Sequence, residues 1–214
     1  MQGFSPESSF GPEAAGRYDD RPRGDGHAAS EFLAARAHGA RALEFAIGTG
    51  RIALPLSELG VEVDGIELSE AMVAQLRKKP GGADLDVWSG DMTAIRTGSS
   101  YGLIYVPSAW IKTNAYARPE DVAANAVVLD VCTYDPATQI LDENHVRIGD
   151  DGVRFSPISC RLAWPSELDL MARIAGLSLL ERYGGWHQQP YTGEGMHVSV
   201  YGRAPASSRA RQTK

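Results

Sequence analysis

The sequence has few cysteines and no long apolar segment. Cys132 and Cys160 are the only cysteines among 214 residues, which is too few for a disulfide scaffold, so both are expected to be reduced thiols. No apolar run approaches the ~20 residues that a membrane-spanning helix needs, and no signal-peptide pattern opens the chain. These absences argue against export and membrane insertion, and we expect a cytoplasmic protein.

Positive charge is not in excess either. The formal net charge is −6, from 21 Lys and Arg against 27 Asp and Glu. Neither nucleic acids nor anionic membrane surfaces attract such a chain, so neither is an expected partner. The sequence also has no zinc-ligand spacing, no nucleophile elbow and no phosphate-binding P-loop, and no metal site is expected. Its length and its 43% of hydrophobic residues suit one ordinary domain with a substantial core.

One segment, residues 41–79, carries the strongest pattern in the chain. An apolar run at residues 42–47 ends at Gly48 and Gly50, and apolar residues at helical spacing follow. A second apolar run ends at Glu67, and another helical stripe completes the segment. The pattern predicts strand, glycine turn, helix, strand and helix.

Such a turn can hold a nucleotide. Gly48 and Gly50 let the backbone approach a ligand closely, and the following helix offers N–H groups at its start. Glu67 lies nineteen residues after Gly48, close to the spacing at which an acid accepts hydrogen bonds from both ribose hydroxyls. The alternative is a structural turn with a solvated acid nearby, but the strand–turn–helix–strand–acid order favours a nucleotide site.

Glu44 bears on which nucleotide is bound. Gly48, Gly50 and Ala53 also satisfy the Gly-x-Gly-x-x-Gly/Ala pattern of dinucleotide-binding folds. Glu44, however, lies inside the first strand, where NAD-binding folds usually have only apolar residues, and its carboxylate can accept hydrogen bonds from an amino group. The motif that starts at Glu44 resembles the first motif, Glu/Asp-x-Gly-x-Gly-x-Gly, of class I S-adenosylmethionine (SAM)-dependent methyltransferases, with Ala46 in place of the first glycine.

Further landmarks of that family are present. Leu68 follows Glu67, and Gly90-Asp91-Met92 follows a predicted third strand, where the resemblance implies an acid near the adenine amino group with the Met92 backbone beside the ring. Tyr18 precedes the first predicted helix and resembles a tyrosine that closes over the SAM carboxylate; the alternative is a loop tyrosine packed on the domain. The resemblance covers most of residues 10–203 and implies these contacts to SAM: Tyr18, Glu44, Gly48, Gly50, Glu67, Leu68, Asp91 and Met92.

The resemblance implies an α/β fold with a Rossmann-like, mostly parallel sheet and helices on both faces. Three strand-like runs at residues 126–134, 139–148 and 153–164, joined by turn sequences, predict an antiparallel meander that resembles the β-lid over the acceptor pocket of small-molecule methyltransferases. The C-terminal runs at residues 177–183 and 197–201 are expected to finish the parallel sheet as an antiparallel pair. A homodimer through the lid is a further expectation.

We expect five segments. They are a flexible N-terminal segment at 1–25, a SAM-binding core at 26–125, the three-stranded lid at 126–164, a helix and strands completing the core at 165–203, and a disordered tail at 204–214.

The chain departs from the family after the fourth predicted strand. Only residues 107–125 separate this strand from the next run, with one short helix expected from Pro119, so the family's fourth helix and fifth strand are missing or shortened. Because unpaired buried backbone groups cost about 1–3 kcal/mol each, residues 107–125 or 126–131 are expected to rebuild the vacancy.

Methyl transfer is an in-line displacement that mainly requires acceptor and methyl carbon to be aligned in a water-poor pocket. An amine acceptor needs no base, whereas a hydroxyl acceptor does, and His145 and His187 are the candidate bases. Each histidine is explained as readily by a surface or core position. The aromatic residues that can line an acceptor pocket, or simply pack in the core, are Tyr105, Trp110, Tyr134 and Trp186.

The preferred hypothesis is a SAM-dependent methyltransferase that acts on a nitrogen or oxygen of a small molecule. One alternative is a SAM-binding protein with reduced or no transferase activity, because the missing segment carries part of the sheet and one wall of the pocket. The other is an NAD-dependent oxidoreductase, which Glu44 and Asp91 disfavour.

Overall fold

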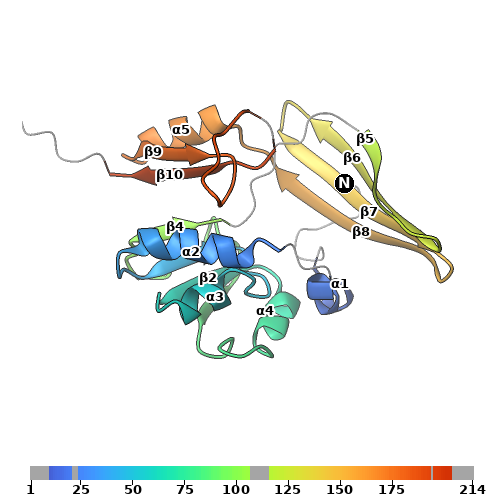
Figure 1. Cartoon of the computed structure of the whole chain (residues 1–214), viewed down its shortest axis with the longest axis horizontal. Coiled ribbons are helices and arrows are strands. Elements are labelled where there is room, and N and C mark those ends of the chain that lie inside the picture. Colours follow the sequence, from blue (N-terminus) through green and yellow to red (C-terminus); the bar gives the residue numbers. More distant parts are fainter. Residues whose placement is uncertain (1–9, 21–23, 107–115, 194, 204–214) are drawn as a thin grey trace, which may run out of the picture. The chain divides into compact units, whose positions relative to one another are not determined.

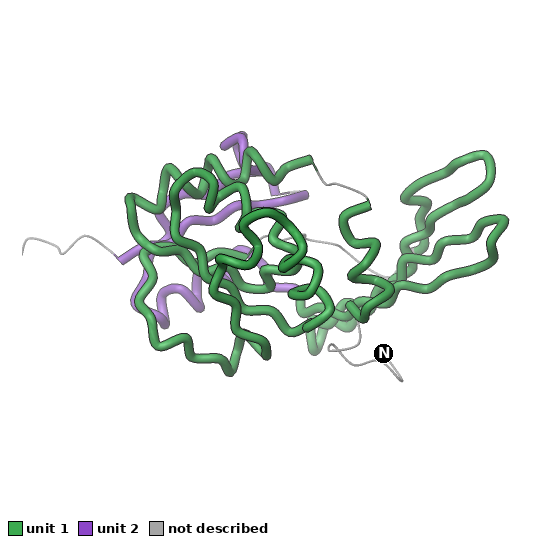
Figure 2. The backbone as a smooth tube through the Cα atoms, turned by 90° about the horizontal axis from the view of Figure 1, so that it is seen from below, with its two compact units in different colours: residues 1–108, 113–161 green, residues 109–112, 162–214 purple. Residues whose placement is uncertain are grey.

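The computed structural model describes residues 10–20, 24–106, 116–193 and 195–203 (Figure 1). The backbone divides into two compact units, residues 1–108 with 113–161, and residues 109–112 with 162–214 (Figure 2). Among the described residues, no helix is both long enough and apolar enough to cross a membrane.

The first unit begins with short helices and a parallel sheet. Its elements are α1 (Pro12–Gly16), the 3-10 helix η2 (Tyr18–Asp20), α2 (Gly26–Ala37), β1 (Ala42–Phe45), α3 (Ala53–Glu58), β2 (Val63–Glu67), α4 (Glu70–Leu76), β3 (Asp86–Ser89) and β4 (Leu103–Tyr105). The strand order is β3-β2-β1-β4, and all neighbours are parallel. The predicted α/β fold with a parallel sheet is confirmed.

Local sequence explains these elements well. Ser69 caps α4, because its side chain accepts a hydrogen bond from the Met72 N–H at 3.2 Å. Ile52, Leu56 and Ile66 are fully buried, and each such side chain contributes about 1.5–3 kcal/mol to folding. The helical stripes and the apolar strands that the sequence predicts therefore form one core around the parallel sheet.

Part of the N-terminal segment forms helices that contact the core. Residues 10–20 contain α1 and η2, and the Ser69 hydroxyl donates a hydrogen bond to the carbonyl of Phe10 at 2.6 Å. The rings of Phe10 and Tyr18 meet edge to face with centroids 5.7 Å apart. Residues 10–20 therefore contact the core, and the flexibility expected for residues 1–25 stays a prediction.

The antiparallel region has four strands, not three. They are β5 (Tyr116–Val122), β6 (Ala126–Asp135), β7 (Ile140–Gly149) and β8 (Gly152–Arg161), in the order β5-β6-β7-β8 (Figure 1). The short helix expected from Pro119 is wrong, since that residue lies in β5 opposite Leu129. A proline is tolerated there because β5 is an edge strand. The N–H groups on its outer side have no described neighbouring strand in this sheet to donate to, so a residue without an N–H costs no hydrogen bond at such a position.

The vacancy beside β4 is not rebuilt by residues 126–131. These residues pair with β5 and β7 in the antiparallel sheet, so the expectation that they repair the parallel sheet is wrong. Among the described strands, β4 pairs only with β1. The other candidate for the repair is residues 107–125, of which residues 116–122 pair with β6 and residues 107–115 lie outside the described residues.

The second unit holds α5 (Pro165–Ile174), β9 (Ser178–Tyr183) and β10 (Val198–Gly202). The expected antiparallel pair is present, but the described residues of β9 and β10 form a two-stranded sheet of their own. Asp169 of α5 accepts hydrogen bonds from Arg182 at 2.6 Å and from the Tyr201 hydroxyl at 2.7 Å. These contacts fix the helix on its hairpin, and the expectation that the pair completes the parallel sheet stays a prediction.

Candidate cofactor site

The turn after β1 is built from residues with left-handed backbone. Ala46, Gly48 and Gly50 have φ values of 55°, 58° and 79°, a region that glycine enters without strain. A Cβ on Gly50 would lie 2.4 Å from Leu76 Cδ1, so the turn also packs too closely on α4 for any side chain. Ala46 holds the same kind of conformation at the position where the methyltransferase motif has its first glycine.

Glu67 holds this turn in place. Its Oε2 accepts a hydrogen bond from the Gly48 N–H at 2.8 Å, and its Oε1 accepts one from the Ser69 N–H at 2.9 Å. Glu67 is only 7% exposed, at the carboxyl end of β2. Because a carboxylate can accept about four hydrogen bonds, two acceptor positions are left for a ligand hydroxyl pair.

Glu44 lies on β1 and is 1% exposed. It is the register partner of Tyr105 on β4, and the Tyr105 hydroxyl donates a hydrogen bond to its Oε2 at 2.9 Å. Burial raises the pKa of Glu44 to about 8, although the Tyr105 hydrogen bond acts in the opposite direction. Burial and the neighbouring Glu44 also raise the pKa of Tyr105, so the phenol remains a donor.

The ends of β2 and β3 bring a second acid to the same edge of the sheet. Glu67 pairs with Ser89, and the Gly90 N–H donates to the Glu67 carbonyl at 2.9 Å. Asp91 follows directly and accepts hydrogen bonds from the Thr93 N–H and hydroxyl, each at 2.8 Å, which lower its pKa. Asp91 is exposed and ionised, Met92 beside it is exposed, and Leu68 is half-buried.

The N-terminal segment contacts the glycine turn through Asp19. Its Oδ1 accepts a hydrogen bond from the Thr49 hydroxyl at 2.8 Å, and its Oδ2 pairs with Lys79 Nζ at 2.7 Å. Lys79 also donates to the Thr49 carbonyl at 2.8 Å. Tyr18, the residue before Asp19, is half-buried beside this network.

Two of these contacts were missed from the sequence. Tyr105 was a candidate for the acceptor pocket, but it is buried as the partner of Glu44. The sequence predicts a cofactor contact for Tyr18, but the neighbouring Asp19 is the residue that contacts Thr49. The pair of Glu44 and Tyr105 follows from the register between β1 and β4. The contact between Asp19 and Thr49 has no signal in the local sequence.

The two candidate bases belong to different compact units. His145 lies on β7 of the first unit, where its ring contacts acidic residues, and His187 is an exposed residue after β9 in the second unit. Of the candidate pocket aromatics, Tyr134 is on β6 and Trp186 is in the second unit, while Trp110 lies outside the described residues.

Comparisons with known proteins identify the family. Residues 42–129 match the family model of a methyltransferase domain. The CcbJ methyltransferase from Streptomyces caelestis is 30% identical, with a TM-score of 0.82 over 94% of this chain and 99% of that chain. The chain belongs to the class I SAM-dependent methyltransferases. No curated protein matches the sequence.

Other solved structures share the fold of this methyltransferase at lower identity. The sugar N-methyltransferase KedS8 from Streptoalloteichus is 16% identical, with a TM-score of 0.62 over 94% of this chain and 95% of that chain. SAM-bound CalS10, an amino pentose methyltransferase from Micromonospora echinaspora, is 21% identical, with a TM-score of 0.59 over 87% and 94% of the two chains. Membership of this family makes SAM the cofactor and overturns the NAD-dependent oxidoreductase alternative.

Proposed function

We propose that this methyltransferase binds SAM across the turn at Gly48 and Gly50 and methylates a nitrogen or oxygen of a small molecule. The observation that carries the proposal is the position of Glu67. Its carboxylate lies at the carboxyl end of β2, is fixed by the N–H groups of Gly48 and Ser69, and keeps two acceptor positions. A pair of neighbouring hydroxyls on a ribose matches these positions.

The other donors and acceptors at this edge fit the rest of SAM. Asp91 is ionised and exposed, as an acceptor for the adenine amino group must be, and the Met92 backbone and Leu68 lie next to the two acids. We assign to Glu44, which is buried on β1 just before the turn, the role of accepting hydrogen bonds from a ligand amino group once it is ionised. We assign to the half-buried Tyr18 the role of closing over the carboxylate of the methionine moiety.

When bound, SAM supplies a methyl group on a sulfonium that is a good leaving group. The protein then needs to hold the acceptor in line and to exclude water. An amine acceptor needs only a neutral nitrogen, whereas a hydroxyl acceptor needs a group that takes its proton, and His145 and His187 remain the candidates for that role. We assign the antiparallel sheet β5–β8 to the acceptor, as its lid.

The acceptor is best sought by product formation. We would incubate the protein with SAM and a panel of amino sugars, because sugar N-methyltransferases are among the structures with the same fold, and in parallel with a cell extract. S-adenosylhomocysteine and a methylated product in the same reaction support the proposal. SAM binding without any product would instead favour the SAM-binding alternative.

The antiparallel sheet is also the proposed dimer contact. Val122, Val153 and Phe155 on its outer strands β5 and β8 are each more than half exposed, which is costly for apolar side chains in water. Size-exclusion chromatography with light scattering should give the mass of a dimer for the natural chain and of a monomer for Phe155→Glu. A natural chain that elutes as a monomer at all concentrations contradicts this assignment.

A further inference from the structure

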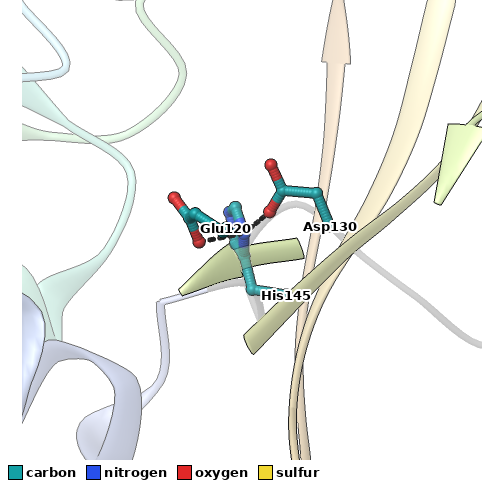
Figure 3. Close-up of side chains that lie close together, drawn as sticks. All are labelled: Glu120, Asp130 and His145. Atoms are coloured by element: carbon teal, nitrogen blue, oxygen red, sulfur yellow. Dashed lines mark hydrogen bonds and ion pairs between the residues drawn. The ribbon is translucent and has the colours of Figure 1, made fainter. Parts of the chain in front are cut away.

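Three metal-ligating residue types lie together on neighbouring strands of the antiparallel sheet. Glu120 belongs to β5, Asp130 to β6 and His145 to β7, and one donor atom from each lies within 4.8 Å of the others. Figure 3 shows both carboxylates directed toward the imidazole ring. Asp130 and His145 are direct register partners, and Glu120 lies at a β-bulge between Pro119 and Asp121. Bulges re-aim side chains and are frequent beside functional sites.

The two oxygens of Asp130 contact different partners. His145 Nδ1 lies 2.5 Å from Asp130 Oδ1 and 3.6 Å from Glu120 Oε2. The second oxygen of Asp130 contacts the Arg118 guanidinium at 3.4 Å, which orients the carboxylate and leaves Oδ1 directed at the imidazole. Asp130 is 2% exposed, whereas the side chains of Glu120 and His145 are 46% and 39% exposed, so an ion reaches the cluster from the side of these two residues.

We propose that Glu120, Asp130 and His145 bind a divalent transition-metal ion such as Zn²⁺ or Co²⁺. Imidazole nitrogen with carboxylate oxygens is a common ligand set for these ions, at bond lengths of about 2.0–2.2 Å, which place tetrahedral ligand atoms about 3.4 Å apart. Moving Asp130 Oδ1 away from Nδ1 by about 1 Å and Glu120 slightly closer gives that spacing. Such shifts require only side-chain rotation, because β5, β6 and β7 hold the three Cα atoms.

A proton competes with a metal ion for the Nδ1 lone pair of His145. Without a metal ion, His145 Nδ1 is hydrogen-bonded to Asp130 Oδ1, and the Arg118 guanidinium lies beside the other oxygen of the same carboxylate. A metal ion needs the Nδ1 lone pair, so a proton on that nitrogen leaves to solvent as the ion binds. Three protein ligands leave at least one coordination position for water or for an oxygen of a small molecule. The site does not depend on the proposed SAM contacts.

The test uses the full chain without a polyhistidine tag, titrated with ZnCl₂ by calorimetry and with CoCl₂ by visible absorption. We expect one Zn²⁺ per chain and a Co²⁺ spectrum of nitrogen and oxygen ligation. Both His145→Ala and Glu120→Gln should weaken binding by at least about tenfold, since each removes a ligand. Glu120 is exposed, so its substitution leaves the fold intact, and circular dichroism checks this for both variants.

A matched control separates the cluster from ordinary surface binding. His27 contacts Glu31 at 3.2 Å on the exposed face of α2, so it offers an imidazole and a carboxylate with no third ligand among the described residues. His27→Ala should leave the stoichiometry and affinity unchanged. The proposal is overturned if the natural chain binds no metal in the micromolar range, or if His145→Ala and Glu120→Gln bind Zn²⁺ as tightly as the natural chain does.

Discussion

The cofactor turn and the antiparallel sheet hold their acids in different ways. In the turn, Glu67 is held by backbone N–H groups of Gly48 and Ser69, which keep their hydrogen at every pH. In the sheet, Asp130 is held by the side chains of His145 and Arg118. Backbone donors fix a carboxylate permanently, whereas a side-chain partner can change its protonation state or exchange for a ligand.

This difference matches the tasks we assign to the two regions. A site for one constant cofactor gains from donors that are preorganised, because little ordering is left to be done on binding. A lid that meets the acceptor gains from groups that can rearrange. Three tests, which together use five substitutions, sharpen or break the comparison, and they are ordered from the largest expected effect to the smallest.

Glu44→Gln tests the buried acid of the cofactor region. The pKa of Glu44 is raised to about 8 from an ordinary 4.5, so the folded state retains a proton that the unfolded state has lost. The free energy of unfolding should therefore fall as pH rises from about 4.5 to about 8. Gln keeps the acceptor for Tyr105 without this titration, and the variant should be more stable at pH 9 by on the order of 3 kcal/mol.

Asp151, in the turn between β7 and β8, should change the free energy of unfolding with pH in the opposite direction to Glu44. Its hydrogen bond with Arg147 lowers the pKa of its carboxyl group, so its contribution is present above the ordinary pKa and is lost as pH falls through the lowered one. Asp151→Asn should therefore lose stability at every pH above the ordinary carboxyl pKa of 3.8, and this loss should disappear as pH falls through the lowered pKa. Urea unfolding between pH 3 and pH 9 measures both variants. Parallel pH profiles of Glu44→Gln and the natural chain would contradict a raised pKa for Glu44.

Gly50→Ala tests packing against backbone strain. Its Cβ would clash with Leu76 at 2.4 Å and with Leu54 at 3.0 Å, in addition to the cost of a φ of 79°. We expect a loss of about 2–3 kcal/mol of unfolding free energy, together with weaker SAM binding. The comparator is Gly152→Ala in the antiparallel sheet, where φ is 108° and no heavy atom lies within 4 Å of the added Cβ.

Gly152→Ala introduces backbone strain without a steric clash. The free energy of unfolding should therefore fall by about 1–2 kcal/mol, and the SAM affinity should not change. Equal losses for the two alanine variants, measured by urea unfolding, would show that close packing does not distinguish the glycine turn.

Ala46→Gly should have the smallest effect and a favourable sign. Ala46 has a φ of 55°, which costs an alanine about 1–2 kcal/mol, and glycine removes this cost while gaining entropy in the unfolded chain. The expected net gain is about 0.5–1 kcal/mol, seen as a higher midpoint of thermal unfolding. A lower midpoint would mean that the alanine methyl group makes contacts that outweigh the strain.

Much of the cofactor region could be predicted because its signals are local. Gly48 and Gly50 occupy positions that need positive φ, Ser69 caps the helix that follows, and Glu67 ends its strand at the expected spacing. The pair of Glu44 and Tyr105 could not be predicted in this way, because it depends on the register between strands that are distant in sequence.

The antiparallel region was predicted less well for the same physical reason. Its three hairpin strands follow from alternation and turn residues, but β5 has a proline and adjacent acids that locally favour a helix start. Pairing with β6 overrides that preference, since a long partner strand satisfies backbone groups that the short helix would leave unpaired. The cluster of Glu120, Asp130 and His145 was missed because only this pairing brings Glu120 to the other two.

Calorimetric titration of SAM into the natural chain, Glu67→Ala and Glu62→Ala tests the central claim most directly. Glu62 lies just before the N-terminal end of β2, whereas Glu67 lies at its C-terminal end, and Glu62 pairs with Arg41 on the surface. It therefore controls for the loss of an acid. We predict one SAM per natural chain, the same affinity for Glu62→Ala, and an affinity lower by about 1–3 kcal/mol for Glu67→Ala. Equal SAM affinity in all three proteins, or no SAM binding by the natural chain, would contradict the account.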